Sequence, residues 1–266
     1  MDYHCLIAGL PEIGFDDAKA GVAVAAFRDE LHAVLSANDK RLIDVYFTRF
    51  DNSNLLRYLQ NKDATHDERG NLSREELEDG MAALRDGSEL KSFPPYFKPF
   101  VEEYAQAADG TLWDDHLADK YYRWAMGCGN RLVSEWFEFN LDVNNILVGY
   151  ACRRHNAATT GVVGDNEVAQ AVRTSSQRDF GLAGVFDYLA EMQRIAEEPD
   201  LYERERKTDL LRWQWLDDKT FFHYFSIERV FACLVKLEIV ERWASLDHET
   251  GRKMFRKMIE DLIHQK

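Results

Sequence analysis

Two stretches of this sequence match each other, FDNSNLL at residues 50–56 and LDVNNIL at residues 141–147. Both have the pattern apolar-Asp-x-x-Asn-apolar-Leu, and both follow an aromatic-rich segment. Each also leads toward basic side chains, namely Arg57 and Lys62 after the first copy and Arg153 and Arg154 after the second. An internal repeat is typical of supersecondary units that stack on one another. The sequence therefore predicts related structural units in the two halves of the chain.

The Asp and Asn of each copy suit the chemistry of a helix end. A carboxylate can accept the backbone amide hydrogen of the third residue that follows it, and so begin a helix after a bend. Capping at a helix junction is therefore the first interpretation of Asp51 with Asn54 and of Asp142 with Asn145. A contact with another protein chain through the same residues is the alternative.

Apolar residues recur at three- to four-residue spacing outward from both copies, which predicts an all-α fold. The chain has only five prolines, too few for the closely spaced turns of an all-β protein. In the first half of the chain, helices are expected over 16–35, from near Ser36, from a capping box of Ser73 and Glu76, and from Leu117 past Asn140. In the second half, a short helix is expected to carry Val168 and Val172, and a further helix to span 182–195. The last two expected helices begin near Ser226 and after Gly251.

Three prolines between residues 94 and 99 make the clearest break in the helical pattern. This break is the best candidate for a domain boundary.

The chain is acidic, with 47 Asp and Glu against 33 Lys and Arg and a formal net charge of −14. This charge argues against binding to nucleic acid or to an anionic membrane, because both need clustered cations. A basic or polar protein partner fits better. No segment approaches the ~20 apolar residues of a membrane-spanning helix, so membrane association is expected only through partner proteins. Four widely spaced cysteines indicate buried thiols in a reducing cytoplasm.

No motif for catalysis, cofactor binding or metal binding stands out. The glycine-containing segment 161–165 lacks the Lys of a phosphate loop. The segment 65–76 has Thr65 and Arg69 at ligand positions where a calcium loop needs carboxylates. The eight histidines lack paired ligand spacing. The sequence therefore predicts no enzyme, no cofactor and no metal.

Two aromatic clusters, at residues 121–124 and 221–225, have two interpretations. They either pack in the core or form an exposed patch that binds a partner. Core packing is the favoured interpretation, because aromatic side chains dominate interiors as well as interfaces. Glu238 and Arg242 form an acid-first i,i+4 pair, worth about 0.3–0.5 kcal/mol on an exposed helix.

The twin motifs resemble those of the C-subunit family of V-type and archaeal-type ATPases, the counterpart of the d-subunit in the eukaryotic V-ATPase. That family carries repeated Asp-x-x-Asn-Leu segments that end in Arg or Lys. The residues here that match are Asp51, Asn54, Leu55 and Arg57, and more loosely Asp142, Asn145 and Ile146. Residues 225–228 and 234–238 resemble the family's C-terminal helix, although Glu241-Arg242-Trp243 stands where the family has Asn-Leu-Arg. The chain is most similar to a bacterial group of unassigned proteins encoded beside V-type ATPase genes.

The resemblance implies three related helical bundles in a funnel-like arrangement without an active site. Their approximate bounds in this chain are 1–94, 95–180 and 181–266. The resemblance also implies a central-stalk subunit that links the axle subunits to the membrane c-type ring, for proton or sodium transport coupled to ATP. Such a protein is cytoplasmic and peripheral to the inner membrane. The structural or interface candidates are Asp51, Asn54, Arg57, Asp142, Asn145, Glu238 and Arg242. A related assembly factor or scaffold, and a helical enzyme or ligand-binding protein, are the alternatives.

Overall fold

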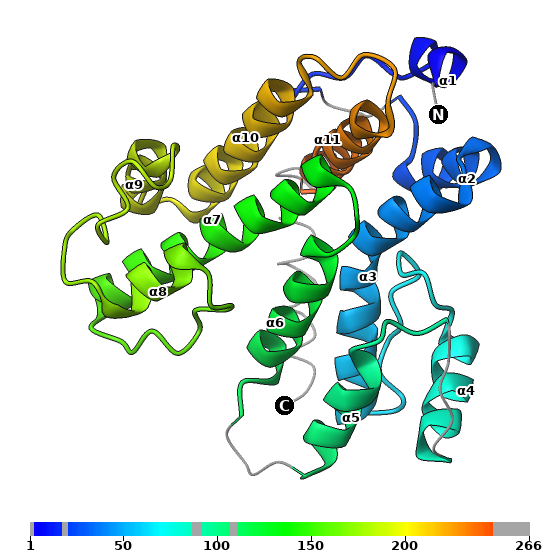
Figure 1. Ribbon diagram of the computed structural model, residues 1–266, viewed down its shortest axis with the longest axis horizontal. Coiled ribbons are helices and arrows are strands. Elements are labelled where there is room, and N and C mark those ends of the chain that lie inside the picture. The colour runs from blue at the N-terminus through cyan, green and yellow to red at the C-terminus, as the bar shows by residue number, and fades with distance from the viewer. Residues whose placement is uncertain (1–2, 18–20, 87–91, 107–110, 247–266) are drawn as a thin grey trace, which may run out of the picture. The chain divides into compact units, whose positions relative to one another are not determined.

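The computed structural model describes residues 3–17, 21–86, 92–106 and 111–246. Within these residues the chain forms eleven α-helices and no strand (Figure 1). The all-α fold predicted from the sequence is confirmed. The helices are α1 (His4–Ala8), α2 (Val24–Val34), α3 (Ala37–Gln60), α4 (Arg74–Arg85), α5 (Phe97–Gln106), α6 (Trp113–Met126), α7 (Arg131–His155), α8 (Glu167–Thr174), α9 (Leu189–Glu197), α10 (Leu201–Thr220) and α11 (Ile227–Ser245).

The helices form two compact units. One unit combines the two ends of the chain, Met1–Ala37 and Asp209–Lys266, and the other is Asn38–Thr208. The first contains α1, α2, α11 and the part of α10 from Asp209 onward. The second contains α4 to α9 and nearly all of α3. The three consecutive bundles expected from the sequence differ from these units and stay a prediction.

The core of the first unit is built around α11. Its buried side chains lie on all sides of the helix and include Phe231, Leu234 and Leu237. A helix that is apolar all round must be covered by others, and α2 packs against it. The N-terminus of α2 is also tied to α11, because the Val24 N–H donates to Glu241 Oε1 at 3.3 Å.

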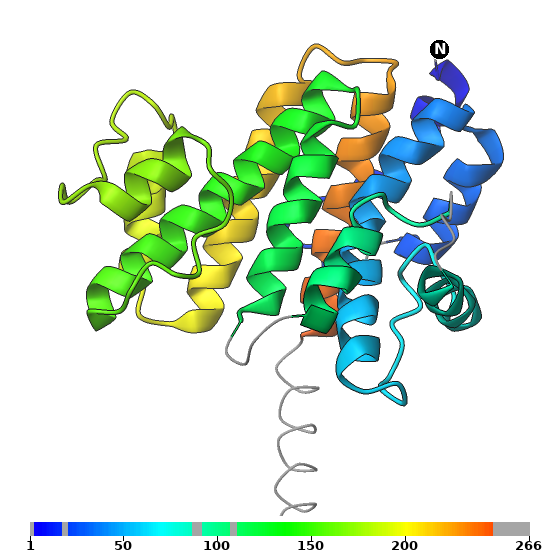
Figure 2. The same cartoon turned by 60° about the horizontal axis from the view of Figure 1, so that its bottom comes forward.

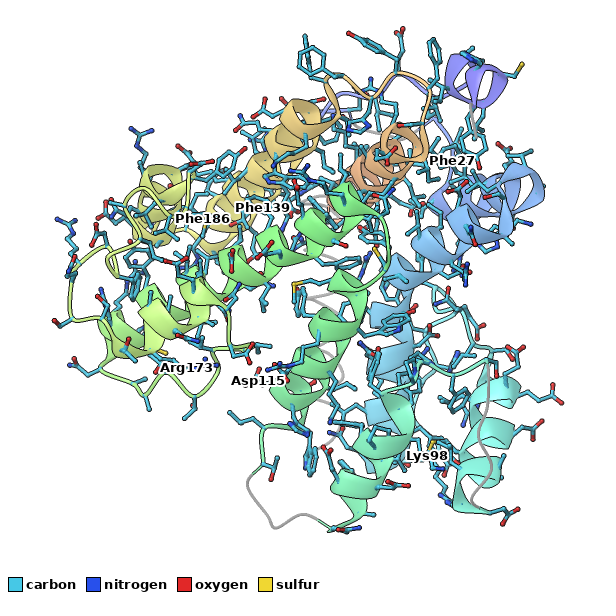
Figure 3. All side chains as sticks on the ribbon, viewed as in Figure 1. Phe27, Lys98, Asp115, Phe139, Arg173 and Phe186 are labelled. Carbon is cyan, nitrogen blue, oxygen red and sulfur yellow. The ribbon has the colours of Figure 1, made fainter. Side chains whose placement is uncertain are left out.

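The second unit is centred on α7, which packs against α6, α8 and α9. Helix α8 lies alongside α7 in both ribbon views (Figures 1 and 2). Phe139 of α7 stacks on Phe186, with ring centroids 6.1 Å apart and planes 11° from parallel; Figure 3 labels both residues. Packing of side chains between α7 and the segments around it therefore holds this unit together.

Gly149 permits the close approach of α7 to its neighbours. A Cβ atom built there would lie 2.6 Å from Val172 Cγ1 and 2.8 Å from Phe180 Cζ. We therefore expect Gly149→Ala to destabilise the fold by about 1–3 kcal/mol through overpacking, measured by urea denaturation. Gly161→Ala is the matched control, because the nearest atom to its new Cβ would be 3.6 Å away. Equal stability of the two variants would contradict this account of the packing.

Three helix predictions need correction. The helix expected over 16–35 begins only at Val24, and the described residues before it form turns and bends. The expected continuous helix from Leu117 past Asn140 is two helices, α6 and α7. The chain breaks at Gly129, where φ is +85°, and the Asn130 side chain then caps α7 by accepting the Val133 N–H at 3.1 Å. The expected helix 182–195 begins only at Leu189. Turns with positive φ at residues 180, 181 and 184 precede it.

Several local predictions are confirmed. Ser73 and Glu76 form a reciprocal capping box at the start of α4. The polar segment before it is a loop, and α8 carries Val168 and Val172 on its buried face. The expected helix after Gly251 lies outside the described residues.

Candidate functional site

The twin motifs lie inside long helices and not at helix junctions. Asp51 and Asn54 are in α3, and Asp142 and Asn145 are in α7. The junction interpretation of these residues is therefore wrong. In a helix interior the backbone N–H groups already donate to carbonyls four residues earlier, so a side chain has no free amide of its own helix to cap. All four side chains are buried and turn to other parts of the chain.

In the first copy, the motif holds a loop against α3. Asn54 Oδ1 accepts the Asp67 N–H at 2.8 Å, and Asn54 Nδ2 donates to the Asp67 carbonyl at 2.9 Å. Asp51 accepts the backbone N–H groups of Asn71 at 2.8 Å and Leu72 at 3.0 Å, and also the Asn71 side-chain amide at 2.7 Å. We call this set of five residues the first clasp. It fixes the loop that leads directly into α4.

Gly70 is required by the first clasp. A Cβ atom at this position would lie 2.3 Å from Asp51 Oδ1, closer than any real contact allows. The loop backbone can therefore reach the carboxylate only without a side chain here. In the sequence Gly70 indicates a loop, but nothing near it indicates Asp51 as its neighbour.

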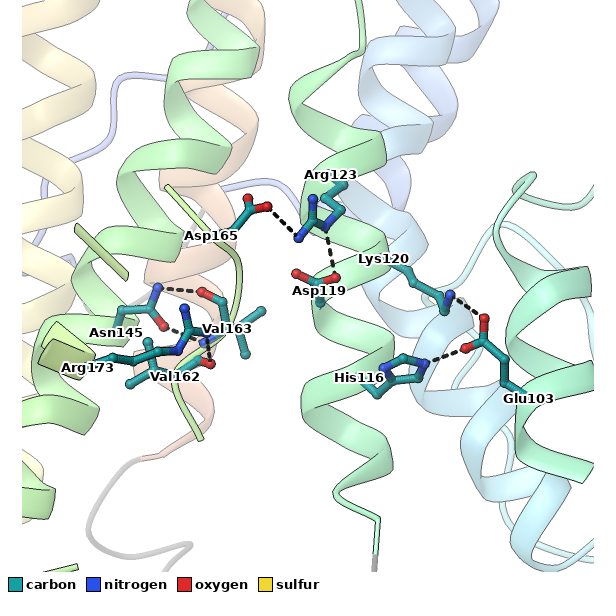
Figure 4. Close-up of polar contacts among 10 residues, drawn as sticks. All are labelled: Glu103, His116, Asp119, Lys120, Arg123, Asn145, Val162, Val163, Asp165 and Arg173. Carbon is teal, nitrogen blue, oxygen red and sulfur yellow. Dashed lines mark hydrogen bonds and ion pairs between the residues drawn. The ribbon is translucent and has the colours of Figure 1, made fainter. Parts of the chain in front are cut away.

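The second copy repeats this arrangement between α7 and α8. Asn145 Oδ1 accepts the Val163 N–H at 2.9 Å, and its Nδ2 donates to the Val163 carbonyl at 2.8 Å (Figure 4). Asp142 accepts the Asn166 side-chain amide at 2.7 Å, and Asn166 in turn caps α8. We call these four residues the second clasp. The predicted repeat is thus a structural one, in which a long helix holds the loop that begins a shorter helix.

The two Asp residues differ in their donors. Burial raises the pKa of Asp142 to about 7; the hydrogen bond from Asn166 opposes this rise, and the negative charge of Glu138 adds to it. Asp51 instead faces backbone amides, which favour a charged carboxylate. The same sequence motif therefore holds two chemically different carboxyl groups.

Ion pairs connect α6 to α5 and to the loop that carries Asp165 (Figure 4). Lys120 contacts Glu103 at 2.9 Å, and Arg123 contacts Asp119 at 2.9 Å and Asp165 at 3.2 Å. These side chains are partly exposed, so each pair contributes at most about 1 kcal/mol. They indicate a hydrophilic surface on this part of the second unit.

The predicted residue Arg242 has a buried partner that the sequence did not reveal. Asp209 is 2% exposed, and it accepts Arg242 at 2.8 Å, Arg212 at 2.8 Å and the indole N–H of Trp243 at 3.0 Å. Arg242 thus stabilises the first unit through a residue 33 positions away. Glu238 is half-buried on α11, and Arg57 is exposed on α3.

One aromatic cluster contradicts the expected core packing. Helix α10 ends at Thr220, and residues 221–225, which we call the aromatic turn, connect it to α11. The exposed fractions are 65% for Phe221, 79% for Phe222, 61% for Tyr224 and 48% for Phe225. The core of this unit is filled by α11 instead. In the other cluster Tyr121 is buried as expected, and its hydroxyl donates to the Val45 carbonyl at 3.1 Å.

The N-terminal segment supports the aromatic turn from one side. The Tyr3 N–H donates to the Phe225 carbonyl at 3.0 Å, and the His4 ring lies 4.2 Å from the Phe225 ring. The Phe221 and Phe222 rings meet edge to face at 4.9 Å. The turn is therefore held by the N-terminal segment at Phe225 and exposes aromatic rings to solvent. Surfaces of this kind commonly mark protein or membrane contacts.

The second unit also contains a cavity of about 770 Å³. The start of α3, the loop at 71–72 and the segments 92–95 and 124–130 line it, with Arg41, Asp44 and Trp124 among the side chains. In the described part of the chain, no group of three or more His, Cys, Asp or Glu side chains is placed to hold a metal ion. None of the described helices is long and apolar enough to cross a bilayer.

These features define an all-α protein with an internal helix–loop–helix repeat and an exposed aromatic turn. Residues 1–266 match the family described as "Protein of unknown function (DUF2764)", and the chain belongs to that family. No curated protein and no solved structure matches it.

Proposed function

We propose that this protein is a non-catalytic central-stalk subunit of a V-type rotary ATPase. In this role it links the axle subunits to the membrane c-type ring, and it is cytoplasmic and peripheral to the inner membrane through those partners. The proposal begins from the resemblance of the twin Asp-x-x-Asn segments to those of the C-subunit family. The clasps give these segments a shared structural purpose, since each fixes one helix–loop–helix unit.

The observation that carries the proposal is the aromatic turn. Four large aromatic side chains within five residues are exposed, whereas a monomeric soluble protein usually buries such groups. Aromatic residues supply much of the binding energy at protein interfaces. A protein that couples other subunits needs surfaces of this type, and the acidic net charge of −14 favours basic or polar partners.

The first experiment is affinity purification of the tagged protein from gently solubilised native membranes. We expect the V-type catalytic, axle and ring subunits to copurify with the wild type. In Phe221→Ser/Phe222→Ser, recovery of these subunits should fall at least tenfold, because interface aromatics commonly contribute about 2 kcal/mol or more each. The free energy of unfolding should change by less than about 0.5 kcal/mol, since both side chains are exposed.

Leu201→Ser/Tyr202→Ser is the matched control, because these side chains are 62% and 54% exposed at another site. It should copurify the same subunits as the wild type. Absence of V-type subunits from the wild-type eluate, with the complex intact in the same membranes, would overturn the proposed function. Recovery only of partly assembled complexes would favour the alternative role of assembly factor or scaffold.

The cavity in the second unit favours a second candidate, a helical ligand-binding protein or enzyme. Its volume of about 770 Å³ lies within the range of small-molecule sites, and Arg41, Asp44 and Trp124 offer charge and an aromatic surface. A thermal-shift screen with small metabolites tests this candidate. A saturable shift that is lost in Trp124→Ala would support it.

A further inference from the structure

The two clasps give their Asp carboxyl groups unequal numbers of hydrogen-bond donors. Asp51 accepts two backbone N–H groups and one side-chain amide of the loop before α4. Among the described residues, only the Asn166 side-chain amide donates to Asp142. Yet Asp142 is only 8% exposed. A buried carboxylate with a single neutral donor is poorly stabilised in its charged form.

We propose that the second clasp is a proton-dependent latch. With Asp142 neutral, its carbonyl oxygen accepts the Asn166 amide and holds the 162–166 loop and α8 on α7. When the carboxyl group loses its proton, the buried charge weakens this attachment, while the first clasp stays closed. This inference does not depend on the proposed function.

The charged groups around Asp142 do not compensate a negative charge there. Glu138 is acidic and lies one turn earlier on α7, and Asp165 and Glu167 flank Asn166. Cations on the helices that pack against α7 have other partners: Arg123 of α6 pairs with Asp119 and Asp165, Arg173 of α8 donates to the Val162 carbonyl, and Arg194 of α9 pairs with Glu191. Figure 4 shows the first two of these cations directed at these partners. The surroundings therefore favour the neutral acid.

The direction of the pH effect follows from the pKa. In the closed latch the pKa of Asp142 is about 7, against an ordinary value of 3.8 in an open, hydrated state. The closed state thus binds the proton more tightly. The stability that this proton adds to the closed latch, relative to the open one, is fully present below about pH 4. It falls as the pH rises toward 7 and is lost above that. The opening constant should rise by nearly tenfold per pH unit in this window, or roughly 50-fold between pH 5 and pH 7.

Hydrogen exchange of the full chain tests the latch. Amide protection of α8 and its preceding loop, corrected for the intrinsic pH dependence of exchange, should fall by roughly 50-fold between pH 5 and pH 7. Protection of α4, which the first clasp holds, serves as the internal control and should change far less. In Asp142→Asn the α8 protection should be independent of pH, because an amide oxygen can accept the same hydrogen bond and cannot ionise.

Parallel behaviour of α8 and α4 in the wild type would overturn the proposal, and so would an unchanged slope in Asp142→Asn. If that variant does not fold, the carboxyl carbon of Asp142 in the wild-type protein can be titrated by NMR. A midpoint near pH 7 supports the latch. A midpoint near pH 4 would overturn it.

Discussion

Asp209→Ala is expected to lower the free energy of unfolding by about 2–4 kcal/mol. Asp209 is 2% exposed and accepts hydrogen bonds from Arg212, Arg242 and Trp243. Removal of the carboxylate leaves an indole N–H and two guanidinium groups without their shared acceptor. The Arg212 side chain is 17% exposed and that of Arg242 is 43% exposed, so water partly compensates their charges, and the expected loss is smaller than for a fully buried ion pair. Urea denaturation at pH 7 measures the effect.

Asp218→Ala is the control for this experiment. Asp218 lies on the same helix, α10, but is exposed, so its replacement should change stability by less than about 0.5 kcal/mol. Asp209→Asn should fall between the two, because the amide keeps one acceptor oxygen and loses the charge. A loss below about 1 kcal/mol in Asp209→Ala would mean that this network does not hold the first unit together.

The fold was predictable from the sequence where the signal is local. Helical spacing of apolar residues identifies the all-α class, and the capping box of Ser73 with Glu76 marks the start of α4. The break between α6 and α7 had a local signal as well, in Gly127, Gly129 and Asn130, but the strong periodicity on both sides concealed it. Helical periodicity alone therefore does not separate two helices that follow one another after a short break.

The candidate site was predictable only in part, because its partners are distant in sequence. The repeat identified Asp51 and Asp142, yet Asn71 follows Asp51 by 20 positions and Asn166 follows Asp142 by 24. Nothing in a single sequence pairs residues over such distances. A weaker signal does exist, since each loop has a Gly and an Asn shortly before a helix start, as in Gly70-Asn71.

The aromatic turn shows a different limit. Four aromatic side chains and one histidine, in succession from Phe221 to Phe225, cannot all face one side of a helix, because neighbouring positions point about 100° apart. That geometry could have indicated a turn. The preference of aromatic residues for both interiors and interfaces made composition alone indecisive.

The repeated motif allows one substitution to be compared in two environments. Asp51→Asn is expected to destabilise the fold by about 3–5 kcal/mol, more than the roughly 0.5–2 kcal/mol of an ordinary lost cap. The Asp51 carboxylate accepts three hydrogen bonds from Asn71 and Leu72. An amide has only one acceptor oxygen, and its NH₂ group would face donors that it cannot accept.

Asp142→Asn should instead be neutral at low pH and stabilising at high pH. The amide oxygen still accepts from Asn166, and the variant removes a group whose pKa burial raises to about 7. Since the wild type loses stability as the pH rises from the ordinary pKa of 3.8 toward 7, the advantage of the variant should grow by about 2–3 kcal/mol between pH 5 and pH 8. Urea denaturation of both variants at these pH values measures the contrast. Equal losses in the two variants would show that the clasps are equivalent, and that their different donor sets have no energetic consequence.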